Sequence, residues 1–219
     1  HFNSNTESLY SCCITTNITH LNKYHIEMNS EKVYVLNLSH SIGRKQKFIK
    51  NNNNTNYEFI TAILYNPGWL GCSLSHKLLV QNANRGEYGY IKICEDDCII
   101  NDINIINIAL ETLITSKKKF ELLSCYMSHI TDNVIIEDII ELNENYKLLK
   151  INEWTSTVFN IYHKDAYKYF LNYDEKKANG YEKDETGNLL WTIDRYLKFK
   201  DIWVIYPFPV NITDEISEI

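Results

Sequence analysis

Three consecutive carboxylates follow an apolar run in the stretch YIKICEDDCII, residues 90–100. Glu95, Asp96 and Asp97 carry charges of one sign, which repel by about 1 kcal/mol at 4 Å in water and by about 4 kcal/mol at an effective dielectric constant of 20. A divalent cation would offset this repulsion, and Mg²⁺ and Mn²⁺ prefer carboxylate and phosphate oxygens as ligands. The triplet predicts either a cation site that also binds a diphosphate, or a solvated turn whose acids cap a helix starting near Ile103.

The metal ligands within the triplet follow from the geometry of an extended chain. Successive side chains of an extended backbone point to opposite faces. Glu95 and Asp97 would then share one face, and Asp96 would lie on the other. We therefore predict that Glu95 and Asp97 bind the metal, with Mn²⁺ or Mg²⁺ as the ion.

Strands and helices are expected to alternate around the triplet. The predicted strands are residues 32–38, 57–64, 90–94, 120–125, 156–162 and 201–206. The predicted helices are residues 43–50, 73–83, 103–115 and 164–171. This alternation indicates an α/β fold whose sheet is largely parallel in its first half. Ligands of such sheets bind at the carboxyl ends of the strands, which is where the triplet lies. Residues 1–31 are polar and aperiodic, so residues 32–219 are expected to form a single domain.

Composition narrows the classes of protein that the chain can represent. With 219 residues, 44% of them hydrophobic, the chain is long enough to bury a sizeable core. Its net charge is −6 and it has no basic stripe, so nucleic acid is not an expected partner. No stretch reaches the roughly 20 apolar residues of a membrane-spanning helix. The six cysteines lack the spacing of a disulfide framework or a paired zinc motif, which favours a reducing, cytoplasmic location.

Three further segments carry a resemblance to a known family. NPGWLGCSLSHKLL at 66–79 precedes the acidic triplet, VYVLNLSHSIGRKQKF lies at 33–48, and STVFNIYHKDAYKYFL at 156–171 is followed by Ile193-Asp194. Together these motifs resemble glycosyltransferase family 25, which includes lipooligosaccharide and collagen galactosyltransferases. The most specific part is G-C-x-L-S-H followed by E-D-D in that order.

The resemblance implies a GT-A fold, in which a Rossmann-like mixed sheet is flanked by helices. It also implies a UDP-sugar donor, a Mn²⁺-type metal and a hydroxyl acceptor on a glycan or a protein. The acidic triplet would correspond to the family's variant of the D-x-D motif. Ser39 stands where the family has Asp, and Trp69 stands where it usually has Glu. The sugar could therefore differ, with galactose and glucose as the hexoses expected.

Four residues are candidates for binding the donor. Asn37 ends a strand where a base or ribose would lie, although Asn is also common in turns. Arg44 could donate to phosphate oxygens, although its basic segment could equally be a solvated helix face. His76 is a candidate for the donor site only because of the resemblance, since a single His in a helix is more often a packed residue. Asp96 is assigned to the same site as the remaining acid of the triplet.

Asp194 is the candidate general base. Inverting transfer requires a carboxylate that accepts the proton of the acceptor hydroxyl as its oxygen attacks the anomeric carbon. Glu153 is the rival for this role, and N-capping of a short helix is the structural alternative for Asp194. The favoured function is a metal-dependent, inverting transfer of a hexose from a UDP-sugar. The alternative is a catalytically silent relative that binds sugar nucleotides or glycans, or that acts as a scaffold.

Overall fold

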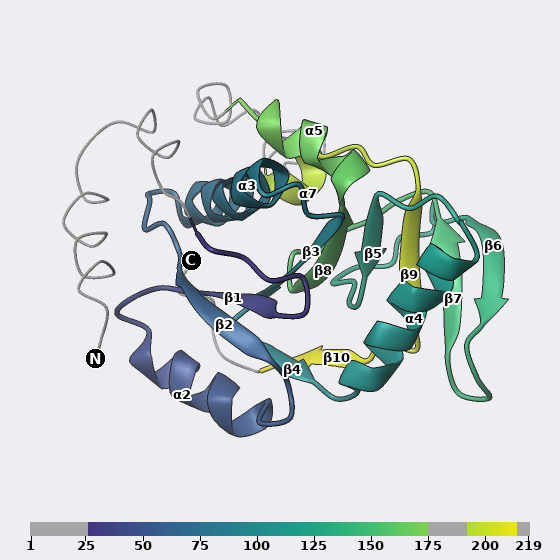
Figure 1. The fold of residues 1–219 in the computed structure, drawn as a ribbon, viewed down its shortest axis with the longest axis horizontal. Helices are drawn as coiled ribbons and strands as arrows, with labels where there is room; N and C mark the ends of the chain where they lie inside the picture. Colours follow the sequence, from purple (N-terminus) through teal and green to yellow (C-terminus); the bar gives the residue numbers. More distant parts are fainter. Residues whose placement is uncertain (1–25, 175–191, 214–219) are drawn as a thin grey trace.

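An eight-stranded mixed sheet lies between two layers of helices in the computed structural model, which describes residues 26–174 and 192–213 (Figure 1). In order across the sheet, the strands are β2 (Tyr57–Thr61), β1 (Val33–Asn37), β3 (Tyr90–Glu95), β8 (Phe159–His163), β5 (Leu122–Ser124), β9 (Ile202–Tyr206), β7 (Lys147–Ile151) and β6 (Ile136–Glu141). Strand β1 pairs in parallel with β2 and β3, whereas β8 is antiparallel to both of its neighbours. The predicted α/β class and the parallel first half are therefore confirmed.

Helices cover both faces of this sheet (Figure 1). One face carries α3 (Gly68–Arg85), a short 3₁₀ helix (Lys164–Ala166), α5 (Tyr167–Leu171) and α7 (Ile193–Tyr196), and the other carries α2 (Ile42–Asn51) and α4 (Ile103–Thr115). The alternation of side chains along β1 explains why both faces need a cover. Tyr34 and Leu36 pack in the core beneath α3, whereas Val33 and Val35 pack in the core beneath α2 and α4.

The first part of the chain forms the unit that positions the acidic triplet. Strand β1, helix α2, strand β2, helix α3 and strand β3 follow one another, and Glu95 is the last residue of β3. This confirms the predicted order of elements and the predicted place of the triplet at the carboxyl end of a strand. After the triplet, β4 (Cys98–Ile100) pairs antiparallel with β10 (Val210–Ile212) in a separate two-stranded sheet.

The structure corrects several predicted boundaries. Helix α3 begins at Gly68, directly after its N-cap Pro67, and not at residue 73. Strand β2 ends at Thr61 and not at residue 64. The sequence interpretation missed β4, β10 and the hairpin of β6 and β7. Strand β6 lacks the regular alternation of buried apolar and exposed polar residues by which a strand is predicted, since Ile136 and Ile139 are both exposed.

The end of the polar N-terminal segment contacts the domain. Met28 is buried in the core under α3, and the backbone N–H of Ile26 donates to the side-chain oxygen of Asn82 at 3.0 Å. Residues 1–25 lie outside the described part of the chain. Among the helices within residues 26–174 and 192–213, none combines the length and apolar character needed to span a bilayer.

Candidate active site

The acidic triplet spans the end of a strand and a tight turn. Glu95 closes β3, Asp96 and Asp97 form a two-residue turn, and β4 starts at Cys98. The backbone is therefore not extended past Glu95, and the expected alternation of the three side chains is wrong. The helix that follows is capped by Asp102, whose side chain accepts from the N–H of Ile105 at 3.0 Å, so the triplet does not serve as its cap.

Three of the predicted donor-site residues contact one another. One guanidinium nitrogen of Arg44, Nη2, pairs with Asp96 and lies 3.2 Å from Oδ2 of Asp97. The amide of Asn37 donates to Oδ2 of Asp96 at 2.6 Å and to the carbonyl of Ser41 at 3.2 Å. Arg44 and Asp96 are each 5% exposed, so this ion pair is buried. Arg44 and Asn37 thus hold the acidic turn against the end of β1.

Glu95 has a different set of neighbours. The hydroxyl of Thr157 donates to its Oε1, and the Sγ of Cys72 lies 3.7 Å from the same oxygen. Burial, and after it the negative charge of Asp97, raise the pKa of Glu95 to about 7, because both disfavour its ionised form. This carboxyl group therefore changes its protonation near neutral pH.

Glu95 and Asp194 line the same cleft, which has a volume of about 210 Å³. Its lining is shared by α3, β3, the segment before β8 and the start of α7: Trp69, Cys72, Glu95, Thr157, Thr192, Ile193 and Asp194. Asp194 is the second residue of α7, whose N-cap is Thr192. The predicted capping alternative for Asp194 is therefore wrong.

Glu153, the predicted rival base, lies elsewhere. Its exposed side chain accepts a hydrogen bond from the hydroxyl of Thr131 at 3.1 Å, and it is absent from the described residues that line the cleft. Its neighbour Trp154 is 6% exposed and packs in the core.

His76 is fully buried in α3 beside the ring of Tyr162, at a centroid distance of 6.0 Å. Burial lowers the pKa of His76 to about 3, so its imidazole is neutral at physiological pH.

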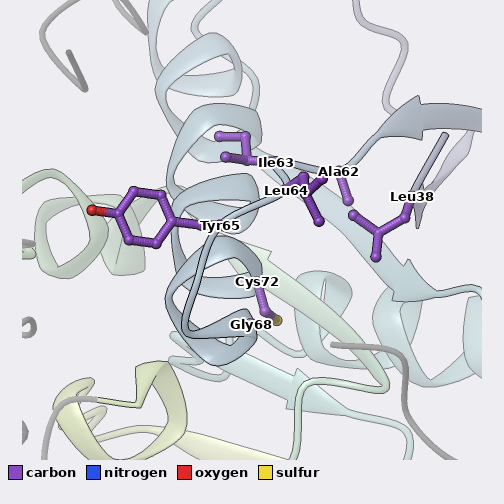
Figure 2. A pocket seen from close by; sticks show the side chains of 7 residues that line it. All are labelled: Leu38, Ala62, Ile63, Leu64, Tyr65, Gly68 and Cys72. Carbon is purple, nitrogen blue, oxygen red and sulfur yellow. The ribbon is translucent and has the colours of Figure 1, made fainter. Parts of the chain in front are cut away.

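Cys72, one helical turn before His76, also lines a second, smaller cavity. This cavity has a volume of about 30 Å³ and lies between α3 and the residues that follow β1 and β2 (Figure 2). Most of the residues that line this second cavity are apolar, including Leu38, Ala62 and Leu64 (Figure 2).

The acidic turn fits a hard divalent cation in charge and in ligand type. Glu95, Asp96 and Asp97 with Arg44 sum to −2 when all are ionised, which a divalent ion would balance. Within the described chain, Oδ1 of Asp97 is buried and has no hydrogen-bond partner. An oxygen of this kind is available to a cation. The assignment of Glu95 and Asp97 as metal ligands stays a prediction.

Five cleft residues were not assigned to the site from the sequence: Trp69, Cys72, Thr157, Thr192 and Ile193. Cys72 could have been found, because it precedes His76 by four residues and so shares its helix face. Thr157 had no such signal, since it reaches Glu95 only through the pairing of β8 with β3.

No model of a known protein family matches the chain, and a search of curated proteins finds no match either. The resemblance to glycosyltransferase family 25 stays a prediction that rests on the motifs.

Proposed function

We propose that the chain is a metal-dependent glycosyltransferase of the GT-A type that transfers a hexose from a UDP-sugar to a hydroxyl acceptor with inversion. The observation that carries this proposal is the shared cleft of Glu95 and Asp194. These two carboxylates are far apart in the sequence, and they meet at the carboxyl end of β3, where α/β sheets bind their ligands. The motifs around 66–79 and the acidic triplet support the same assignment.

The donor diphosphate binds at the acidic turn, with Glu95 and Asp97 as ligands of Mn²⁺ or Mg²⁺. The bound cation supplies charge neutralisation for the leaving diphosphate. Arg44 and Asn37 act as positioning residues, because their contacts to Asp96 fix the turn that carries both ligands. Thr157 orients Glu95 by donating to its Oε1.

Asp194 is the general base in this proposal. Its carboxylate accepts the proton of the acceptor hydroxyl while that oxygen bonds to the anomeric carbon and the bond to the UDP oxygen breaks. The place of Asp194 in the cleft supports this role over that of Glu153. Trp69 borders the same cleft and offers an aromatic surface for the sugar ring.

The test measures UDP release from UDP-galactose and UDP-glucose with Mn²⁺, using water as the acceptor. We expect Asp194→Asn to lower the rate by at least about a hundredfold, because removal of a general base typically costs 10²- to 10⁴-fold. UDP affinity measured by calorimetry and the melting temperature should stay close to wild type.

Glu153→Gln is the matched control, and it should keep the wild-type rate. A wild-type rate in Asp194→Asn would move the base to another residue, and a lowered rate in Glu153→Gln would identify Glu153 as that base. Binding of UDP without release from any hexose donor would favour the catalytically silent alternative. No binding of UDP with Mn²⁺ would contradict the proposal as a whole.

A further inference from the structure

We propose that Cys72, His76 and Glu95 form a tetrahedral site for Zn²⁺ or a similar borderline transition metal, with its fourth position open to the cleft. The three side chains each offer one ligand atom, and these atoms all lie within 4.8 Å of one another. The inference does not rest on the transfer reaction proposed above and shares with it only Glu95.

The first two ligands come from one face of α3. Cys72 and His76 are four residues apart, which places side chains one above the other on a helix. The same spacing lets paired ligands of helical zinc sites reach one ion. The third ligand, Glu95, comes from the adjacent end of β3, so the site is anchored on two rigid elements.

The separation of sulfur and oxygen already suits such an ion. Zinc binds thiolate sulfur at about 2.3 Å and carboxylate oxygen at about 2.0–2.2 Å, so a tetrahedral angle places the two ligand atoms about 3.5–3.7 Å apart. The Sγ of Cys72 lies 3.7 Å from Oε1 of Glu95. Metal binding therefore requires little movement of this pair.

His76 gives an independent indication that a ligand is missing. Its side chain is 0% exposed, and neither ring nitrogen has a hydrogen-bond partner within the described chain. A buried polar group without a partner is costly, and native proteins seldom leave one. One of these nitrogens belongs to the cluster with Cys72 and Glu95, so a metal ion would use its lone pair.

The ligand set also selects among metals. Thiolate and imidazole ligands favour Zn²⁺ and Co²⁺, whereas Mg²⁺ and Mn²⁺ favour oxygen. Because Cys72 and Glu95 also line the cleft, the fourth position would face the space beside Asp194 and Thr157. Three protein ligands with one open position are typical of catalytic rather than structural zinc sites.

The test is a titration of the metal-free protein with Co²⁺, which replaces Zn²⁺ and gives an absorption band when bound to a thiolate. We expect the wild-type protein to bind one equivalent with a sulfur-to-cobalt charge-transfer band and strong visible bands of tetrahedral Co²⁺. Zn²⁺ should abolish these bands by displacement. Cys72→Ser and His76→Gln should each weaken Co²⁺ binding by more than about a hundredfold, since loss of even an outer-shell partner costs 10- to 100-fold.

Two control variants separate this site from other ligands. Cys12→Ser/Cys13→Ser removes the two adjacent thiols near the start of the sequence, and Asp97→Asn removes the other predicted metal ligand of the acidic turn. Both variants should keep the cobalt bands, while Asp97→Asn should weaken binding of UDP with Mn²⁺.

Three results would overturn the inference: no charge-transfer band in the wild type, a band that persists in Cys72→Ser, or a band that disappears with Cys12 and Cys13. A melt of each variant confirms folding. If His76→Gln does not fold, Cys72→Ser decides the matter, because it exchanges a single atom at the edge of the cleft.

Discussion

Arg44 counterbalances two carboxylates that would otherwise share a buried turn. Removing one partner of a buried ion pair leaves the other charge without compensation, which costs about 3–5 kcal/mol. We therefore expect Arg44→Met to lower the free energy of unfolding by about that amount, as measured by urea denaturation with chelator present. Lys147→Met is the control, because Lys147 and its partner Glu141 are 48% and 63% exposed. Exposed pairs contribute about 1 kcal/mol or less, so equal losses in the two variants would contradict the structural role of Arg44.

The sequence predicted which residues of the candidate site lie close together, but it did not predict how their side chains contact one another. Three neighbouring acids at the end of an apolar strand indicated the candidate site, and Asn37 and Arg44, which were assigned to it, contact Asp96. A turn was one of the two predicted alternatives for the triplet, but the choice of metal ligands assumed an extended chain, because a two-residue turn leaves no periodic pattern. The contacts of Arg44 depend on the distance between α2 and the end of β3, which only the packed sheet defines.

Gly71 lets the first turns of α3 approach the chain that follows β2. A Cβ at this position would lie 2.4 Å from the carbonyl oxygen of Ile63 and 3.2 Å from the N–H nitrogen of Tyr65, both backbone atoms. Alanine would force the two segments apart, and such overpacking typically costs about 1–3 kcal/mol. We expect Gly71→Ala to lower the melting temperature, although alanine is the better helix former.

The matched control is Gly43→Ala in α2, where a Cβ would meet nothing within 4 Å. Here the gain in helix propensity, up to about 1 kcal/mol, should raise the melting temperature. Opposite signs for the two glycines are the expected result. A gain of stability in Gly71→Ala would show that α3 can move away without cost.

The elements were predicted best where the apolar pattern was strong. Helix α4 was predicted with its exact bounds, because Ile105, Ala109 and Leu113 recur at helical spacing and all are buried. Helix α3 was predicted too short, because Pro67-Gly68 was interpreted as a break and Leu70, one turn before Leu74 and fully buried, was not included in the pattern. Strands β4 and β10 have three residues each, which is too few for a pattern of any period to emerge.

The stability of the whole molecule should depend on pH through the acidic turn. In the unfolded chain Glu95 loses its proton near its ordinary pKa of 4.5, whereas burial and the charge of Asp97 raise its pKa in the folded protein to about 7. Between these values the folded state binds more protons than the unfolded state. The free energy of unfolding should therefore fall as the pH rises from 4.5 to 7. Burial raises the pKa of Asp96 and Asp97 in the same direction.

Urea denaturation of the metal-free protein across this pH range measures the effect. Glu95→Gln should reduce the loss of stability, because glutamine does not titrate. Glu144→Gln, at an exposed position of the β6–β7 hairpin, should leave the loss unchanged. Identical pH profiles for wild type and Glu95→Gln would exclude a buried titration at Glu95.

The strand that closes the acidic turn comes from a distant part of the chain. Strand β10 pairs with β4, and the N–H of Thr213 donates to the backbone carbonyl of Asp97 at 2.8 Å. A ribosome would therefore have released β3, the turn and β4 long before their partner emerged. Until residues 210–213 had also emerged, the acids would remain on an unpaired loop without their folded arrangement.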